Sequence, residues 1–131
     1  MPPVEGGCLC GAVSYRVDGE LRPVIGCHCS QCRKTSGHHV AATAADNAAI
    51  DVADPGEALR WYRSSSFAQR AFCSRCGSNL FWKRDDASYT AITAGTLNGP
   101  TGLRIEAHIF TADKGDYYTL DNDVPCFPAS R

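Results

Sequence analysis

The 131-residue sequence has no long apolar run and no strong charge bias. No stretch approaches the roughly 18 apolar residues of a membrane-spanning helix, and the opening "MPPVEGG" lacks the basic start and apolar run of a secretion signal. The 13 basic and 14 acidic residues give a net charge of −1, without a basic tail or stripe for a polyanion. We therefore expect a soluble, cytoplasmic protein that binds neither membranes nor nucleic acid.

Internal repeats, low-complexity segments and an evident linker are also missing. A chain of this length with 44% hydrophobic residues can bury one core but is short for two. Short alternating segments separated by Gly, Pro and Asn are typical of half-buried strands joined by turns. The segments predicted to be strands are 12–17, 39–45, 49–52, 58–64, 70–73, 79–84, 89–95 and 104–112. The pattern predicts a mainly β protein with a single domain over residues 1–131.

One short segment, "CHCSQCRKTSG" at residues 27–37, combines three cysteines with a helical signal. Within it we expect a short helix over residues 31–36, with Ser30 as its N-cap and Gly37 as its C-terminal stop.

Cysteine, in contrast, is abundant, with eight residues in the chain. Seven fall into three groups: Cys8 with Cys10, Cys27 with Cys29 and Cys32, and Cys73 with Cys76. Thiols stay reduced in the cytosol, so this clustering favours metal ligation over disulfides. Gly11 and Gly77 follow two of the groups, where a glycine lets the backbone turn and direct an N–H group at a thiolate.

Coordination number suggests how the seven cysteines divide. A closed structural zinc site takes four protein ligands, whereas a catalytic site takes three and keeps an open position. The natural grouping assigns Cys8, Cys10, Cys73 and Cys76 to a structural zinc and leaves Cys27, Cys29 and Cys32 as an open site.

Two alternatives stay open at this point. Cys126 or His28 could complete the triplet as a second closed site, although Cys126 is isolated and His28 would face away from its neighbours on a strand. A C-x-x-C pair could instead act in redox chemistry, but the βαβ context typical of such motifs is not evident.

Four segments together resemble a known family: "GGCLCGAVSY", "CHCSQCRKTSG", "FCSRCGSNLFW" and "HIFTADKGDYYTLDNDVPCF". In this order and separation they are similar to those of the glutathione-dependent formaldehyde-activating enzymes, a family that also includes centromere protein V. The resemblance implies a zinc-bearing β-tent fold of short antiparallel strands with little helix. It also implies a carbon–sulfur lyase activity, which in the family joins glutathione and formaldehyde.

The resemblance implies the same division of ligands between two zinc ions. The structural ligands fall on Cys8, Cys10, Cys73 and Cys76, and the catalytic ligands on Cys27, Cys29 and Cys32. Cys126 stands where the family usually has glutamine, which argues against a ligand there.

The open site suggests a mechanism. We predict that a small-molecule thiol takes the fourth zinc position, loses its proton and adds to a small aldehyde. Arg33 and Lys34 follow Cys32 and could neutralise the thiolates or bind a substrate carboxylate, with Arg33 the stronger candidate. Sequence alone assigns no role to His38, His39 or His108. The alternative function is a non-enzymatic, zinc-stapled interaction module.

Overall fold

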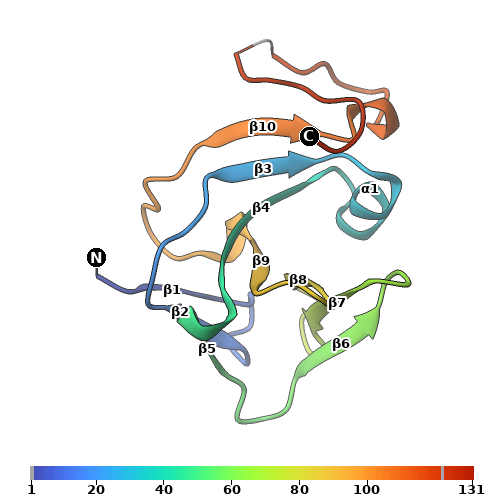
Figure 1. Ribbon diagram of the computed structural model, residues 1–131. Coiled ribbons are helices and arrows are strands. Elements are labelled where there is room, and N and C mark those ends of the chain that lie inside the picture. Colours follow the sequence, from blue (N-terminus) through green and yellow to red (C-terminus); the bar gives the residue numbers. More distant parts are fainter. Residues whose placement is uncertain (1, 122) are drawn as a thin grey trace. The chain divides into compact units, whose positions relative to one another are not determined.

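The computed structural model describes residues 2–121 and 123–131 as a mainly β protein (Figure 1). Its strands are β1 (Val4–Gly7), β2 (Ser14–Val17), β3 (Val24–Cys27), β4 (Val40–Asp46), β5 (Ile50–Ala53), β6 (Leu59–Arg63), β7 (Ala68–Cys73), β8 (Asn79–Arg84), β9 (Tyr89–Thr93) and β10 (Ile105–Ile109). The helices are α1 (Ser30–Ser36) and the short 3-10 helices η1 (Asn47–Ala49), η2 (Ala94–Thr96) and η3 (Thr111–Asp113). The predicted mainly β fold with little helix is confirmed.

Most predicted strands are found within a few residues of their expected bounds, but the alternation rule missed β1 and β3. Their sequences, "VEGG" and "VIGC", are four residues long, contain glycine and show no clear apolar alternation. In addition, the expected N-cap is wrong by one residue. Ser30 is the first helical residue, and Cys29 is the N-cap, because its sulfur accepts the backbone hydrogen bond of Cys32.

The chain forms two compact units. The first comprises residues up to Arg22 together with Thr43–Gly102, and the second comprises Pro23–Ala42 together with the residues from Leu103 onward.

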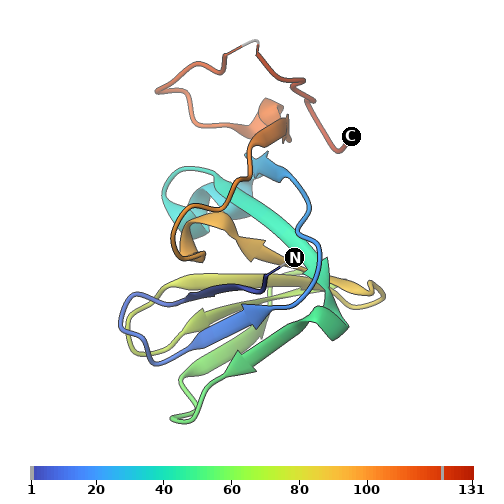
Figure 2. The same cartoon turned by 90° about the vertical axis from the view of Figure 1, so that its left-hand side faces the viewer.

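In the first unit, antiparallel strands surround an apolar core. One sheet has the order β1-β2-β5, and the strands β9, β8, β7 and β6 are neighbours in that order in the other. Tyr15 on β2, only 3% exposed, has its ring centroid 5.4 Å from that of Phe81 on β8. In Figure 2 the blue strands of one sheet lie alongside the yellow-green strands of the other. This packing buries the alternate residues whose spacing predicted the strands.

In the second unit, β3 lies between β10 and the first residues of β4 (Figure 1). β10 runs parallel to β3, whereas β4 is antiparallel to it. Helix α1 follows β3 directly and ends at Gly37, which adopts φ 81° and donates its N–H group to the carbonyl oxygen of Arg33. The C-terminal segment pairs with β10 through hydrogen bonds between Phe127 and His108 and between His108 and Pro125.

Candidate metal centres

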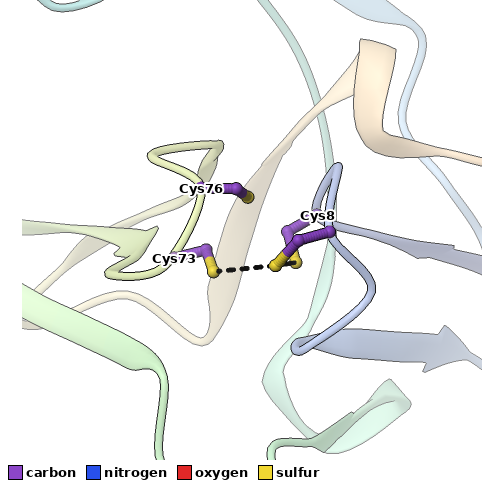
Figure 3. A group of neighbouring side chains, drawn as sticks. Cys8, Cys73 and Cys76 are labelled. Atoms are coloured by element: carbon purple, nitrogen blue, oxygen red, sulfur yellow. Dashed lines mark hydrogen bonds between the residues drawn. The ribbon is translucent and has the colours of Figure 1, made fainter.

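Four cysteines of the first unit converge at the ends of β1 and β7. Cys8 and Cys10 lie in the turn after β1, Cys73 ends β7, and Cys76 lies in the turn that follows. Figure 3 shows the side chains of Cys8, Cys73 and Cys76 pointing toward one another. All four sulfurs lie within 4.8 Å of one another.

The spacing of these sulfurs fits a tetrahedral metal site. The Cys10 sulfur is 3.7 Å from that of Cys8 and 3.8 Å from that of Cys73. Zinc–sulfur bonds of about 2.3 Å in a tetrahedron give sulfur–sulfur edges of about 3.8 Å. The four-cysteine group could therefore hold a metal ion with little rearrangement.

Glycine shapes both turns of this group, as the sequence predicts. Gly11 and Gly77 each have φ 82°, and their N–H groups donate to the carbonyl oxygens of Cys8 (3.3 Å) and Cys73 (2.7 Å). The N–H group expected to reach a sulfur is supplied by another residue, because Val13 donates to the Cys8 sulfur at 3.3 Å. The glycines thus close the turns and leave contact with sulfur to a residue further along the chain.

The local hydrogen bonds favour ionised sulfur at two of the four positions. The Ser78 side chain and backbone lower the pKa of Cys76 to about 5. For Cys8, burial raises the pKa, but the hydrogen bonds from Val13, Cys10 and Cys73 outweigh burial and lower the pKa overall. At Cys10 a backbone hydrogen bond from Ala12 lowers the pKa, but burial and the other three sulfurs outweigh it and raise the pKa to about 11. Such crowded thiolates are what a bound cation stabilises.

A second group, in the other unit, contains three cysteines. Cys27 ends β3, Cys29 caps α1, and Cys32 lies buried in the first turn of α1. Their sulfurs also lie within 4.8 Å of one another. Hydrogen bonds to the Cys29 and Cys32 thiols, followed by burial, strongly raise the pKa of Cys27. Three thiolates at this distance require a compensating cation, so this group could also hold a metal ion.

The two residues considered as a fourth ligand of the triplet lie outside the group. Cys126 is exposed, with its sulfur 3.6 Å from the carbonyl oxygen of Val124. Both ring nitrogens of His28 have other partners, Tyr118 and His108. Within residues 2–121 and 123–131, the group around the triplet contains no fourth histidine, cysteine or carboxylate.

The two cations after the triplet differ in their surroundings. Arg33 is half-buried, and its Nε donates to the carbonyl oxygen of Asp113 at 3.2 Å. One edge of its guanidinium is therefore held by the backbone at Asp113. Lys34 is exposed on α1. In the described part of the chain, neither side chain is in an ion pair with a carboxylate. Of these two cations, Arg33 is thus the one whose side chain is fixed by a hydrogen bond.

Sequence reasoning missed a cluster of aromatic side chains around His28. The ring of His28 is 0% exposed and stacks on His39 at 4.4 Å between centroids. Burial, together with the charges of the other histidines, lowers the pKa of His28 to about 4, so the ring is neutral near pH 7. Tyr118, 90 residues away in sequence, bonds its Nδ1. Only the position of His28 between two cysteines pointed toward this cluster.

Comparison with known proteins gives consistent matches. A model of the glutathione-dependent formaldehyde-activating enzyme family matches residues 3–113. A Schizosaccharomyces pombe protein named as an uncharacterized lyase is 30% identical over 129 residues, which are 97% of this chain and 92% of that protein. A Halomonas elongata protein named for glutathione-dependent formaldehyde activation is 38% identical over 85 residues, 60% of this chain and 54% of that protein.

A solved structure supports the fold. The crystal structure of a Rhodobacter sphaeroides protein has a TM-score of 0.62 and 25% sequence identity, covering 93% of this chain and 98% of that one. Together with the family match, this likeness confirms the predicted β-tent fold. None of the helices in the described residues has the length and apolarity needed to cross a membrane.

Proposed function

The chain belongs to the glutathione-dependent formaldehyde-activating enzyme family, and on this premise we propose that it is a zinc-dependent carbon–sulfur lyase. It adds a small-molecule thiol, glutathione or a similar compound, to formaldehyde or another small aldehyde, or catalyses the reverse cleavage. The observation that carries this proposal is a triplet of convergent cysteine sulfurs with no fourth ligand in its group among the described residues.

We assign two zinc ions to the chain, with different roles. Cys8, Cys10, Cys73 and Cys76 form a closed structural set, and Cys27, Cys29 and Cys32 form a set with an open position. A zinc ion held by the triplet supplies a cation that lowers the pKa of a thiol in that open position. The proposal also places the protein in the cytoplasm, where eight cysteines stay reduced.

For this reaction the protein needs mainly to position the thiol and the aldehyde and to supply positive charge. In the addition, the S–H bond of the thiol breaks and a C–S bond forms at the carbonyl carbon, while the C=O double bond becomes a single bond and the proton is transferred to its oxygen. Arg33 contributes positive charge beside Cys32 and can bind a carboxylate of the thiol substrate through its terminal nitrogens. Lys34, exposed on the same helix, contributes only to the positive electrostatic potential around the site.

Metal analysis with matched variants tests the proposal. We expect two zinc ions per chain in the wild type and one in Cys29→Ser, with Cys126→Ser as the control that retains both. After exchange of both zinc ions for Co²⁺, added glutathione should shift the absorption bands of the triplet ion and leave those of the four-cysteine site unchanged. Turnover of a thiol with formaldehyde should disappear in Cys29→Ser.

The rival function predicts a different set of results. A zinc-stapled interaction module would hold either one zinc ion or two zinc ions in closed four-ligand sites. Added thiols and aldehydes would then leave the spectrum of the metal unchanged. A triplet metal that does not respond to glutathione or to any of several small thiols would refute the lyase proposal.

A further inference from the structure

His28 lies between Cys27 and Cys29 in the extended segment that joins β3 to α1. Cys29 has φ −61° and ψ 160°, an extended conformation. Because successive side chains of an extended chain point to opposite sides, the ring of His28 faces away from the side of the two sulfurs. The N–H group of His28 also donates to the carbonyl oxygen of Ile109 at 3.0 Å. The main chain between these two cysteines is therefore attached to β10.

The ring of His28 is held at both nitrogens. Its Nδ1 is 2.5 Å from the hydroxyl of Tyr118, and its Nε2 is 2.9 Å from Nδ1 of His108. Two arrangements of protons satisfy this row of hydrogen bonds from Tyr118 through His28 to His108. Either Tyr118 donates to His28, which donates to His108, or His108 donates to His28, which donates to Tyr118. In both arrangements, loss of one partner leaves a fully buried ring nitrogen unsatisfied.

The packing around these three hydrogen-bonded side chains leaves the ring of His28 little freedom to move. A Cβ atom added at Gly26 would lie 2.5 Å from Nδ1 of His108 and 3.5 Å from Nε2 of His28, so the space beside this contact depends on glycine. His39 covers one face of the His28 ring in a stacked arrangement. Lys114 donates to the carbonyl oxygen of Tyr118 at 2.5 Å and lies over its ring, which fixes the tyrosine in turn.

We propose that His28, His108 and Tyr118 form a bracket that positions the sulfurs of Cys27 and Cys29 for metal binding. The inference rests on the proposed function, because it takes the triplet as a metal site. His28 acts through the main chain, because its fixed ring determines the direction in which the side chains of Cys27 and Cys29 point. The bracket is thus a positioning device that keeps the open three-ligand site organised although it lacks the fourth protein ligand of a closed site.

The adjacent tyrosine provides a matched control. Tyr117 is 61% exposed, and its hydroxyl is 2.7 Å from Nδ1 of His38 and 3.5 Å from the carbonyl oxygen of Gly37, whereas its ring lies 4.9 Å from that of Tyr118 between centroids. Tyr117→Phe and Tyr118→Phe therefore remove the same hydroxyl group from neighbouring positions, but only the second removes a partner of His28.

The experiment measures zinc affinity at both cysteine groups of the full chain by competition with a chromophoric chelator. Tyr118→Phe should weaken zinc binding at the triplet about tenfold or more, as the loss of a supporting hydrogen bond does in other metal sites. The four-cysteine site should keep its affinity, which shows that the chain remains folded. Tyr117→Phe should leave both affinities unchanged.

Variants of the other partner separate hydrogen bonding from bulk. Asparagine can place an amide group near the position of Nδ1, whereas leucine cannot form a hydrogen bond, so His108→Leu should lose triplet affinity and His108→Asn should recover most of it. Retained triplet affinity in Tyr118→Phe and His108→Leu would overturn the bracket. Equal losses at both cysteine groups, or the same loss in Tyr117→Phe, would overturn it as well.

The proposed function fails by a different result. If Cys29→Ser keeps two zinc ions, the triplet is not a metal site. If Cys29→Ser loses one ion while the bracket variants retain wild-type affinity, the bracket alone is refuted.

Discussion

Gly26→Ala is the substitution whose consequence follows most directly from the structure. Gly26 lies on β3, opposite His108 on the parallel strand β10. An added Cβ atom would approach Nδ1 of His108 to 2.5 Å and its Cε1 to 3.0 Å, distances shorter than ordinary van der Waals contact. To reach ordinary van der Waals distance from the new Cβ, the imidazole must move by about 1 Å, and movement away from His28 stretches the present 2.9 Å hydrogen bond beyond its normal range.

The expected cost comes from overpacking in a buried region. Inserting a methyl group into a filled space usually destabilises a protein by about 1–3 kcal/mol, and we expect Gly26→Ala to fall in this range. Urea denaturation of the zinc-loaded protein, monitored by tryptophan fluorescence, measures the free energy of unfolding. Chelator competition on the same variant should show weaker zinc binding at the triplet and unchanged binding at the four-cysteine group.

Gly95→Ala is the matched control for this experiment. Gly95 lies in η2, has no atom within 4 Å of an added Cβ, and does not adopt a positive φ. Its substitution should therefore leave stability unchanged or slightly increased. If Gly26→Ala were as stable as Gly95→Ala and bound zinc equally well at the triplet, the reasoning from the close contact would be refuted.

Three further predictions concern the first unit. Cys73→Ser should lower the thermal midpoint more than Cys29→Ser, because a closed four-ligand set joins the turns after β1 and β7; calorimetry would contradict this if the order were reversed. Gly77→Ala should reduce the free energy of unfolding by about 1 kcal/mol, because φ 82° is strained for alanine. An unchanged urea denaturation curve would contradict the positive φ at this position. Burial raises the pKa of Tyr15, so the stability it contributes is complete below the unfolded pKa near 10 and is lost as pH rises through its higher folded pKa. Tyr15→Phe should flatten the alkaline decline in unfolding free energy, and equal slopes would contradict it.

Local sequence patterns predicted the parts of the fold that depend on local geometry. Alternation revealed most strands, because each buries one face, and Gly37 marked the end of α1, because its φ of 81° favours glycine. The same rules missed β3, whose residues Val24–Gly26 are all buried and show no alternation. They also placed the N-cap at Ser30, since serine is the usual cap, whereas the sulfur of Cys29 takes that role.

Cysteine spacing by itself determined three local sets, Cys8 with Cys10, Cys27 with Cys29 and Cys32, and Cys73 with Cys76. Ligands two or three residues apart are brought together by a single turn, so the sequence carries the geometry of each local set directly. The tertiary structure joins the two pairs, since the sulfurs of Cys10 and Cys73 lie 3.8 Å apart although the residues are 63 positions apart in sequence. Only the tertiary structure decided what surrounds the triplet. His108 and Tyr118 lie 80 and 90 residues from His28, and they reach it because β10 pairs in parallel with β3 and the chain then returns past α1. Contacts of that kind depend on long-range strand register, which no local pattern encodes.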